Sequence, residues 1–302
     1  MRTRSLAAIA LAATLVLALA ACGGVARVAY NNGDVALRFV ADDYFDLHGE
    51  QREVLKTQLA RFHAWHRREE LPRYVALFGG ASERIEKGLT REDVTWAVAG
   101  VRARYRATVE QVADEAPPLV ATFGPENFSA LEKKLVTNND KFAKEFLAGD
   151  ATKQTRARAK RLAELFEDWL GDLTPEQEAL IERFVRAQPD MNRIRLEDRR
   201  RRQAQFVALL REYQKSPELA PRLREFFVHW ERDRGPEHRR QALEWEDRLA
   251  TLVLDIDQSL SPRQRRNAAQ KFAAYAEDAR VLAREGRPAG PSAGVGAAIA
   301  AQ

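Results

Sequence analysis

The chain has 302 residues, of which 45% are hydrophobic and 31% are charged, and its 49 lysines and arginines against 44 aspartates and glutamates give a net charge of +5. Because both signs are interspersed, the charges indicate a solvated helical surface rather than a nucleic-acid-binding one. The single cysteine excludes a disulfide within one chain. The sequence contains no Gly-rich phosphate loop and no nucleophile elbow.

The first 21 residues have the pattern of a secretory signal peptide. Arg2 and Arg4 form a positive start, and residues 6–19 are an uninterrupted run of apolar and small residues. An uncleaved membrane anchor is the alternative, but the run is shorter than the roughly 20 residues that a spanning helix needs. We therefore expect residues 1–21 to be a signal peptide that is removed.

The cysteine stands directly after this run, in "LAAC", which resembles the lipobox of bacterial lipoproteins. The resemblance implies cleavage before Cys22 and acylation of its thiol with diacylglycerol, so that palmitate-type chains anchor the protein. Gly23, a residue other than Asp, implies the outer membrane of a Gram-negative cell, with the protein on the inner leaflet facing the periplasm. Residues 22–33 would then be the lipidated N-terminus and a short tether. A buried or reactive free thiol is the alternative.

Downstream, the hydrophobic periodicity is helical wherever it can be judged, with no strand-like alternation. We expect an all-α fold in which amphipathic helices form an extended or curved bundle. The clearest apolar stripe consists of Val94, Val98, Val101, Tyr105, Val109 and Val112. The expected helices span residues 35–45, 49–68, 71–87, 91–119, 126–148, 152–170, 175–187, 190–213, 217–231, 236–259 and 262–284. Residues 285–302 can bury little and are expected to be a disordered tail.

A recurring phrase predicts where helices begin. In "DLTPEQ", Thr174 is the expected N-cap and Gln177 can reach back to the N-cap N–H, which forms a capping box. "SLSPRQ" repeats the pattern with Ser261 and Gln264, and "GLTRED" has a reduced form that begins at Thr90. Two further relatives are "DLHGEQ", with His48 at the cap, and "TFGPEN".

The spacing of these phrases suggests an internal duplication. Leu47 and Phe123 are 76 residues apart, and Leu173 and Leu260 are 87 apart. We therefore expect two similar helical halves, residues 34–170 and 171–284.

The motifs carry two resemblances. L-[ST]-P-x-Q at residues 173–177 and 260–264 resembles the LTxxQ motif of the Spy/CpxP-type periplasmic chaperones, which are small all-helical proteins that dimerise into a curved cradle. Most of the mature chain also resembles a family of uncharacterised Gram-negative lipoproteins built around a domain of unknown function. The blocks that carry this second resemblance are "DDYFDL", "WHRREELPRY", "NNDKFAKEFL", "EDWLGDLTPEQ" and "LSPRQ". The chain departs from that family at "FGPEN", where another L-[ST]-P-E-Q is usual.

These blocks also supply candidate site residues. His63 and His66 are one turn apart and could share a metal with His48 or Glu69, but His66 occupies an apolar-stripe position that a core histidine more commonly fills. Asn138 also lies at an inward position, where a buried amide fixes helix register or contacts a ligand. We predict no metal and no cofactor. The candidate partner-binding residues are Trp65, His66, Arg67, Tyr74, Asn138, Asn139, Lys141, Phe142 and Trp169.

Two function classes follow. The first is a non-catalytic, membrane-tethered module that binds envelope proteins, as a chaperone-like holder or as a scaffold, without nucleic acid or a small-molecule cofactor. The alternative is a cell-envelope hydrolase that acts on peptidoglycan with paired carboxylates. No catalytic constellation is recognisable, so we expect no enzyme. The sequence leaves the oligomeric state open.

Overall fold

The computed structural model describes residues 24–189, 191–232 and 234–285. The expected signal peptide, Cys22 and residues 286–302 lie outside the described residues. Every regular element of the described part is a helix, which confirms the all-α fold. The elements are α2 (Gly24–Asn31), α3 (Gly33–Phe45), α4 (Glu50–Trp65), the π-helical turn η1 (His66–Glu70), α5 (Leu71–Lys87), α6 (Arg91–Glu115), α7 (Pro117–Val120), α8 (Pro125–Phe146), α9 (Ala151–Leu170), α10 (Pro175–Ala187), α11 (Asn192–Tyr213), α12 (Leu219–Val228), α13 (Pro236–Gln258) and α14 (Pro262–Glu285).

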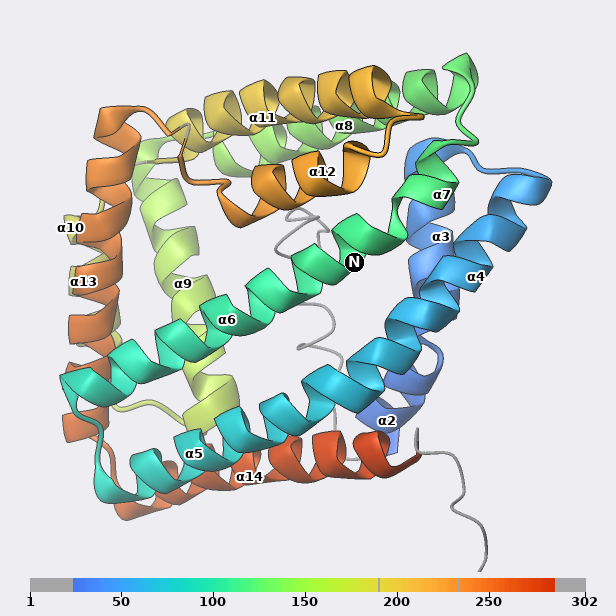
Figure 1. Cartoon of the computed structure of the whole chain (residues 1–302). Coiled ribbons are helices and arrows are strands. Elements are labelled where there is room, and N and C mark those ends of the chain that lie inside the picture. The colour runs from blue at the N-terminus through green and yellow to red at the C-terminus, as the bar shows by residue number, and fades with distance from the viewer. Residues whose placement is uncertain (1–23, 190, 233, 286–302) are drawn as a thin grey trace, which may run out of the picture.

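The helices are arranged as a four-sided frame (Figure 1). α5 and α14 lie side by side along one edge, α9, α10 and α13 form the next, α8, α11 and α12 form the third, and α3 and α4 form the fourth. α6 crosses the frame diagonally, from the α13 edge to α12. Among the described helices, none combines the length and the apolar character needed to cross a membrane.

Three apolar clusters of the described residues hold the frame together, and all three combine residues from both expected halves of the chain. One joins α3, α4, α7 and α8 to α11 and α12, for example through Leu131 and Leu210. A second joins Tyr30, Leu71 and Tyr74 to α14. The third lies where the end of α5, at Ile85, meets α9, α10, α13 and α14. The halves 34–170 and 171–284 therefore interlock through shared cores.

Two departures from the expected helices have a clear physical cause. The expected helix 91–119 ends at Glu115, because Pro117 and Pro118 have no N–H to continue the hydrogen-bond ladder. Residues 24–31, inside the expected tether, form α2, and its Tyr30 is only 3% exposed. Burial of this side chain against α14 makes α2 part of the fold.

The apolar stripe of α6 is buried only over its C-terminal part. Val109 and Ala113 are buried, whereas Val98 is 42% and Val101 62% exposed. The apolar stripe of this helix is therefore not one continuous buried face. The reason lies in the tertiary arrangement, because α12 covers the end of α6 while its first half spans the frame.

Candidate functional site

The capping motifs meet in pairs. Thr174 and Gln177 form the capping box of α10, and the side-chain oxygen of Gln264 accepts the N–H of Ser261 at 3.1 Å at the start of α14. The amide groups of Gln177 and Gln264 also donate to each other's oxygens, at 3.2 and 2.9 Å. Gln177 is 0% and Gln264 6% exposed. The Gln177–Gln264 junction thus joins two helix starts that are 87 residues apart.

The same junction is built a second time from the two weaker motifs. Gln51 and Asn127 donate to each other at 2.9 and 3.2 Å, and they link the starts of α4 and α8. Asn127, in the divergent "FGPEN", also accepts the N–H of Gly124 at 2.8 Å, so it takes the place of the usual glutamine. Thr90 and Asp93 form an ordinary capping box on α6. The Gln177–Gln264 and Gln51–Asn127 junctions therefore fasten helices to each other, and all four side-chain amides are hydrogen-bonded within the described part of the chain.

The block "WHRREELPRY" contains the π-helical turn η1. His66 is 2% exposed, and its Nδ1 lies 2.8 Å from the hydroxyl of Tyr30 on α2. The Nε2 atom of His66 is buried and has no hydrogen-bond partner among the described residues, and the same holds for the Nε2 atom of His63. Burial, together with His63 and Arg67, lowers the pKa of His66 to about 3, and burial also lowers the pKa of His63. Among the described residues no group of histidines and acids is arranged to hold a metal.

A pH dependence follows from His66. The unfolded chain protonates this histidine near pH 6.5, whereas the folded chain keeps it neutral down to about pH 3. Unfolding therefore takes up a proton in this window, and stability falls as the pH falls. Lowering the pH from 6.5 to 5.0 should lower the free energy of unfolding by about 1.6 kcal/mol through His66 alone. Chemical denaturation at the two pH values should show that His66→Gln removes this part of the loss, and an unchanged loss in the variant would contradict the assignment.

Glu70, at the end of the same turn, is a fully buried carboxylate. It is 0% exposed and lies between two arginines from different helices. Arg104 of α6 contacts both carboxylate oxygens, at 2.9 and 2.8 Å, and Arg73 of α5 contacts one at 2.7 Å. This ion-pair network fixes the point where the diagonal helix passes the η1 turn.

The remaining candidate partner-binding residues fall into separate packing contacts. His66, Tyr74, Asn138, Asn139 and Phe142 are buried, Trp65, Arg67 and Trp169 are partly buried, and Lys141 is exposed. Asn138 donates to the Tyr44 hydroxyl at 2.9 Å, which fixes α8 against α3. Trp169 packs on Phe272, with the ring centroids 4.4 Å apart. The structure does not bring these residues together on one surface.

A groove of about 570 Å³ lies between α6 and α13, and we call it the α6–α13 groove. The sequence did not predict it as a site. Its floor is apolar and its rim is charged. The floor consists of Val94, Val98, Ala99, Ala103 and Ala250, and the rim of Arg91, Arg102, Arg106, Glu246 and Asp247. The exposed Val101 lies next to the floor on α6, and Leu243, 62% exposed, lies one turn earlier on the groove side of α13.

Neighbouring contacts hold the two walls of the groove in place. Arg91 pairs with Asp247 and Arg102 with Glu246, each at 2.8 Å across the groove. From behind, α5 approaches α6 closely at Gly100, where an added Cβ would lie 2.5 Å from Leu77 Cδ1. Arg106 makes no ion pair with any described residue. The groove therefore presents apolar surface and one unpaired cation on a rigid support.

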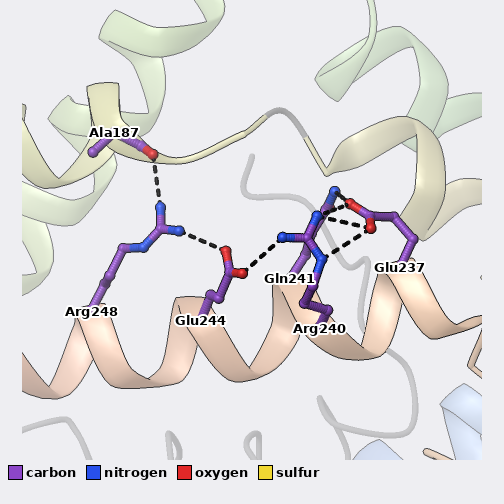
Figure 2. Close-up of polar contacts among 6 residues, drawn as sticks. All are labelled: Ala187, Glu237, Arg240, Gln241, Glu244 and Arg248. Carbon is purple, nitrogen blue, oxygen red and sulfur yellow. Dashed lines mark hydrogen bonds and ion pairs between the residues drawn. The ribbon is translucent and has the colours of Figure 1, made fainter.

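A different side of α13 attaches it to α10 (Figure 2). Arg240 binds Glu237 at 2.8 Å and Glu244 at 3.0 Å, and Arg248 binds Glu244 at 2.8 Å. Arg248 also donates to the carbonyl of Ala187 at the end of α10, at 2.9 Å, where a cation complements the helix dipole. These contacts pair the charges on that side of α13 and fasten the helix to α10.

A comparison with protein families finds one match, over residues 43–239, to a family model described as a family of unknown function, DUF6279. The matched residues include α6 and the N-terminal end of α13. A comparison with curated proteins finds no match, and a comparison with solved structures finds none either.

Proposed function

The chain belongs to DUF6279, a family of unknown function, and we propose that it is a non-catalytic protein-binding module that uses the α6–α13 groove. The observation that carries this proposal is the exposed apolar stripe of α6, because Val98 and Val101 are 42% and 62% exposed beside the apolar floor of the groove. Contiguous apolar surface rimmed by charge is typical of sites that bind other proteins.

The proposed partner is a protein segment with apolar side chains and at least one carboxylate. The apolar groups would cover the valines and alanines of the floor, and the carboxylate would pair with Arg106. Partly unfolded envelope proteins expose such segments, which gives the chaperone-like form of the proposal. One folded envelope partner gives the scaffold form. The resemblance of the LTPEQ-type motifs to Spy/CpxP-type chaperones supports the first form.

We further propose that the protein is a lipoprotein held by Cys22 in the inner leaflet of the outer membrane, facing the periplasm. The support is the lipobox-like "LAAC" after a short apolar run and the Gly23 that follows it. Such an anchor would leave the helical frame in water near the membrane, where unfolded envelope proteins pass.

The groove is tested by two acidic substitutions. The chain without residues 1–22 should suppress the aggregation of insulin whose disulfides have been reduced, as measured by light scattering without ATP. Val98→Asp combined with Val101→Asp should abolish this suppression, because carboxylates replace the apolar floor. Both sites are exposed, so the free energy of unfolding should change by no more than about 0.5 kcal/mol at each.

The matched control combines Val136→Asp with Leu165→Asp, which removes two equally exposed apolar residues outside the groove. This variant should suppress aggregation as well as the wild type does. If both double variants lose the activity equally, the groove is not the binding surface. If the wild type shows no suppression, the chaperone-like form fails. The scaffold form is then tested with a photo-crosslinker at position 101 and, as a control, one at position 165. Capture of one folded envelope protein from position 101 but not from position 165 supports the scaffold form.

A further inference from the structure

The first two helices, α2 and α3, are separated by the single residue Asn32, and we call them together the α2–α3 rod. Asn32 lies between α2 and α3, and its N–H donates to the carbonyl of Val28 at 3.1 Å. The carbonyl of Asn32 in turn accepts the N–H of Val35 at 3.1 Å. Asn32 therefore ends the hydrogen bonding of α2 and begins that of α3, and residues 24–39 span at most about 24 Å at the helical rise of 1.5 Å per residue.

The solvent-exposed side of this rod carries no charge from position 28 to position 39. Val28 on α2 is 63% exposed, and Val35 and Phe39 on α3 are 53% and 64% exposed. The spacing of four residues places Val35 and Phe39 on the same side of α3. The other exposed residues between positions 28 and 39 are two alanines and two asparagines. In a chain with 31% charged residues, a solvent-facing side of this length would normally carry charges.

The charges of this segment are turned away and paired. Asp34 and Arg38 are both partly buried and bind each other at 3.0 Å. Arg27, just before the segment, binds Asp278 of α14 at 3.4 Å. The ion pairs thus lie beside the uncharged side and do not interrupt it.

The position of the rod in the chain indicates what covers this side. Gly24, the first residue of α2, is two residues after Cys22, and two residues reach at most about 7 Å. A lipid on Cys22 would therefore hold the start of α2 at the level of the lipid headgroups. Helices that lie in the membrane interface bury an apolar side to a depth of about 5 to 10 Å.

We propose that the uncharged side of the α2–α3 rod, centred on Val28, Val35 and Phe39, lies against the lipid bilayer and orients the frame on it. This inference rests on the proposed lipid anchor at Cys22. Because α3 packs on α4 and α8, and α2 packs on α14, contact of the rod with the bilayer fixes the orientation of the whole frame.

The test places an environment-sensitive nitrobenzoxadiazole label on the rod. The full-length chain is produced and processed in a Gram-negative host and reconstituted into vesicles of phosphatidylethanolamine and phosphatidylglycerol. Since Cys22 is the only native cysteine and its thiol is acylated in the lipidated protein, an introduced cysteine takes the label. The test position is Val35→Cys and the matched control is Leu165→Cys on α9, both of which are 53% exposed.

Flotation of the vesicles reports the anchor, and the fluorescence reports the surface. We expect the protein to float, with emission at position 35 shifted to shorter wavelength and increased in intensity, while position 165 stays unchanged. Flotation without a shift at position 35 overturns the inference and leaves the anchor in place. The emission at position 35 is also measured without vesicles at increasing protein concentration. A shift that appears under these conditions overturns the inference, because a second copy of the chain then covers the rod. If the wild type floats no better than Cys22→Ser, the proposed anchor fails and the inference fails with it.

Discussion

Replacing Glu70 with glutamine is expected to lower the free energy of unfolding by about 3 kcal/mol, the lower end of the range for breaking a buried ion pair. The carboxylate is 0% exposed and binds Arg104, whose side chain is 19% exposed, and Arg73, which is 49% exposed. Without the negative charge, the guanidinium of Arg104 stays in the interior without a counter-charge. The half-exposed Arg73 can turn to water, which is why the expected loss is not larger. Urea unfolding followed by circular dichroism measures the effect.

Two variants separate this explanation from general damage to the turn. Glu69→Gln removes the neighbouring carboxylate, which is 40% exposed and pairs with Arg68. This substitution should lower the free energy of unfolding by less than about 1 kcal/mol. Adding Arg104→Met to Glu70→Gln should restore part of the stability, because the unpaired cation is then removed as well. The opposite outcome is that Arg104→Met lowers the free energy of unfolding as much in the Glu70→Gln background as in the wild type. In that case Glu70 does not stabilise the fold through its ion pair with Arg104.

Gln177→Ala and Gln264→Ala are each expected to lower the free energy of unfolding by about 2 to 4 kcal/mol. Each substitution removes a hydrogen bond to an N-cap N–H and leaves the amide of the other glutamine buried without one of its partners, which itself costs about 1 to 3 kcal/mol. The two side chains contact each other directly. The double variant should therefore cost at least about 1 kcal/mol less than the sum of the single variants.

The control for the Gln177–Gln264 junction is Gln270→Ala, which removes an exposed glutamine from α14. This substitution should change stability by less than about 0.5 kcal/mol. Additive losses in the double variant, measured by urea unfolding, would show that the two capping boxes act separately and that the contact between their amides contributes little.

The local features of the fold were predictable because they depend on residues close in sequence. Thr174 and Gln177 are three positions apart, as are Ser261 and Gln264, so the sequence alone identifies both helix starts. Periodicity likewise placed α5 at residues 71–87 and α10 at residues 175–187, the bounds that the structure shows. The inward positions of His66 and Asn138 also followed from their place in apolar stripes.

The contacts between distant helices were not predictable in this way. The sequence shows why Gln177 caps α10, but only the frame shows that its amide meets that of Gln264. Arg73 lies one turn from Glu70, whereas Arg104 reaches it from a helix 34 residues away. The stripe of α6 resembles any core-facing stripe, because periodicity shows that a face is apolar and cannot show whether another helix covers it.

The sequence by itself determined the all-α class, most helix ends and the capping chemistry, and it contains the lipobox-like segment from which we propose the anchor. These properties depend on propensity, side-chain spacing and local hydrogen bonds. Only the tertiary structure decided which apolar residues remain exposed, namely Val98 and Val101 at the α6–α13 groove and Val28, Val35 and Phe39 on the α2–α3 rod. The physical reason is that burial of a side chain depends on which helix packs against it, and that choice is made by the whole chain.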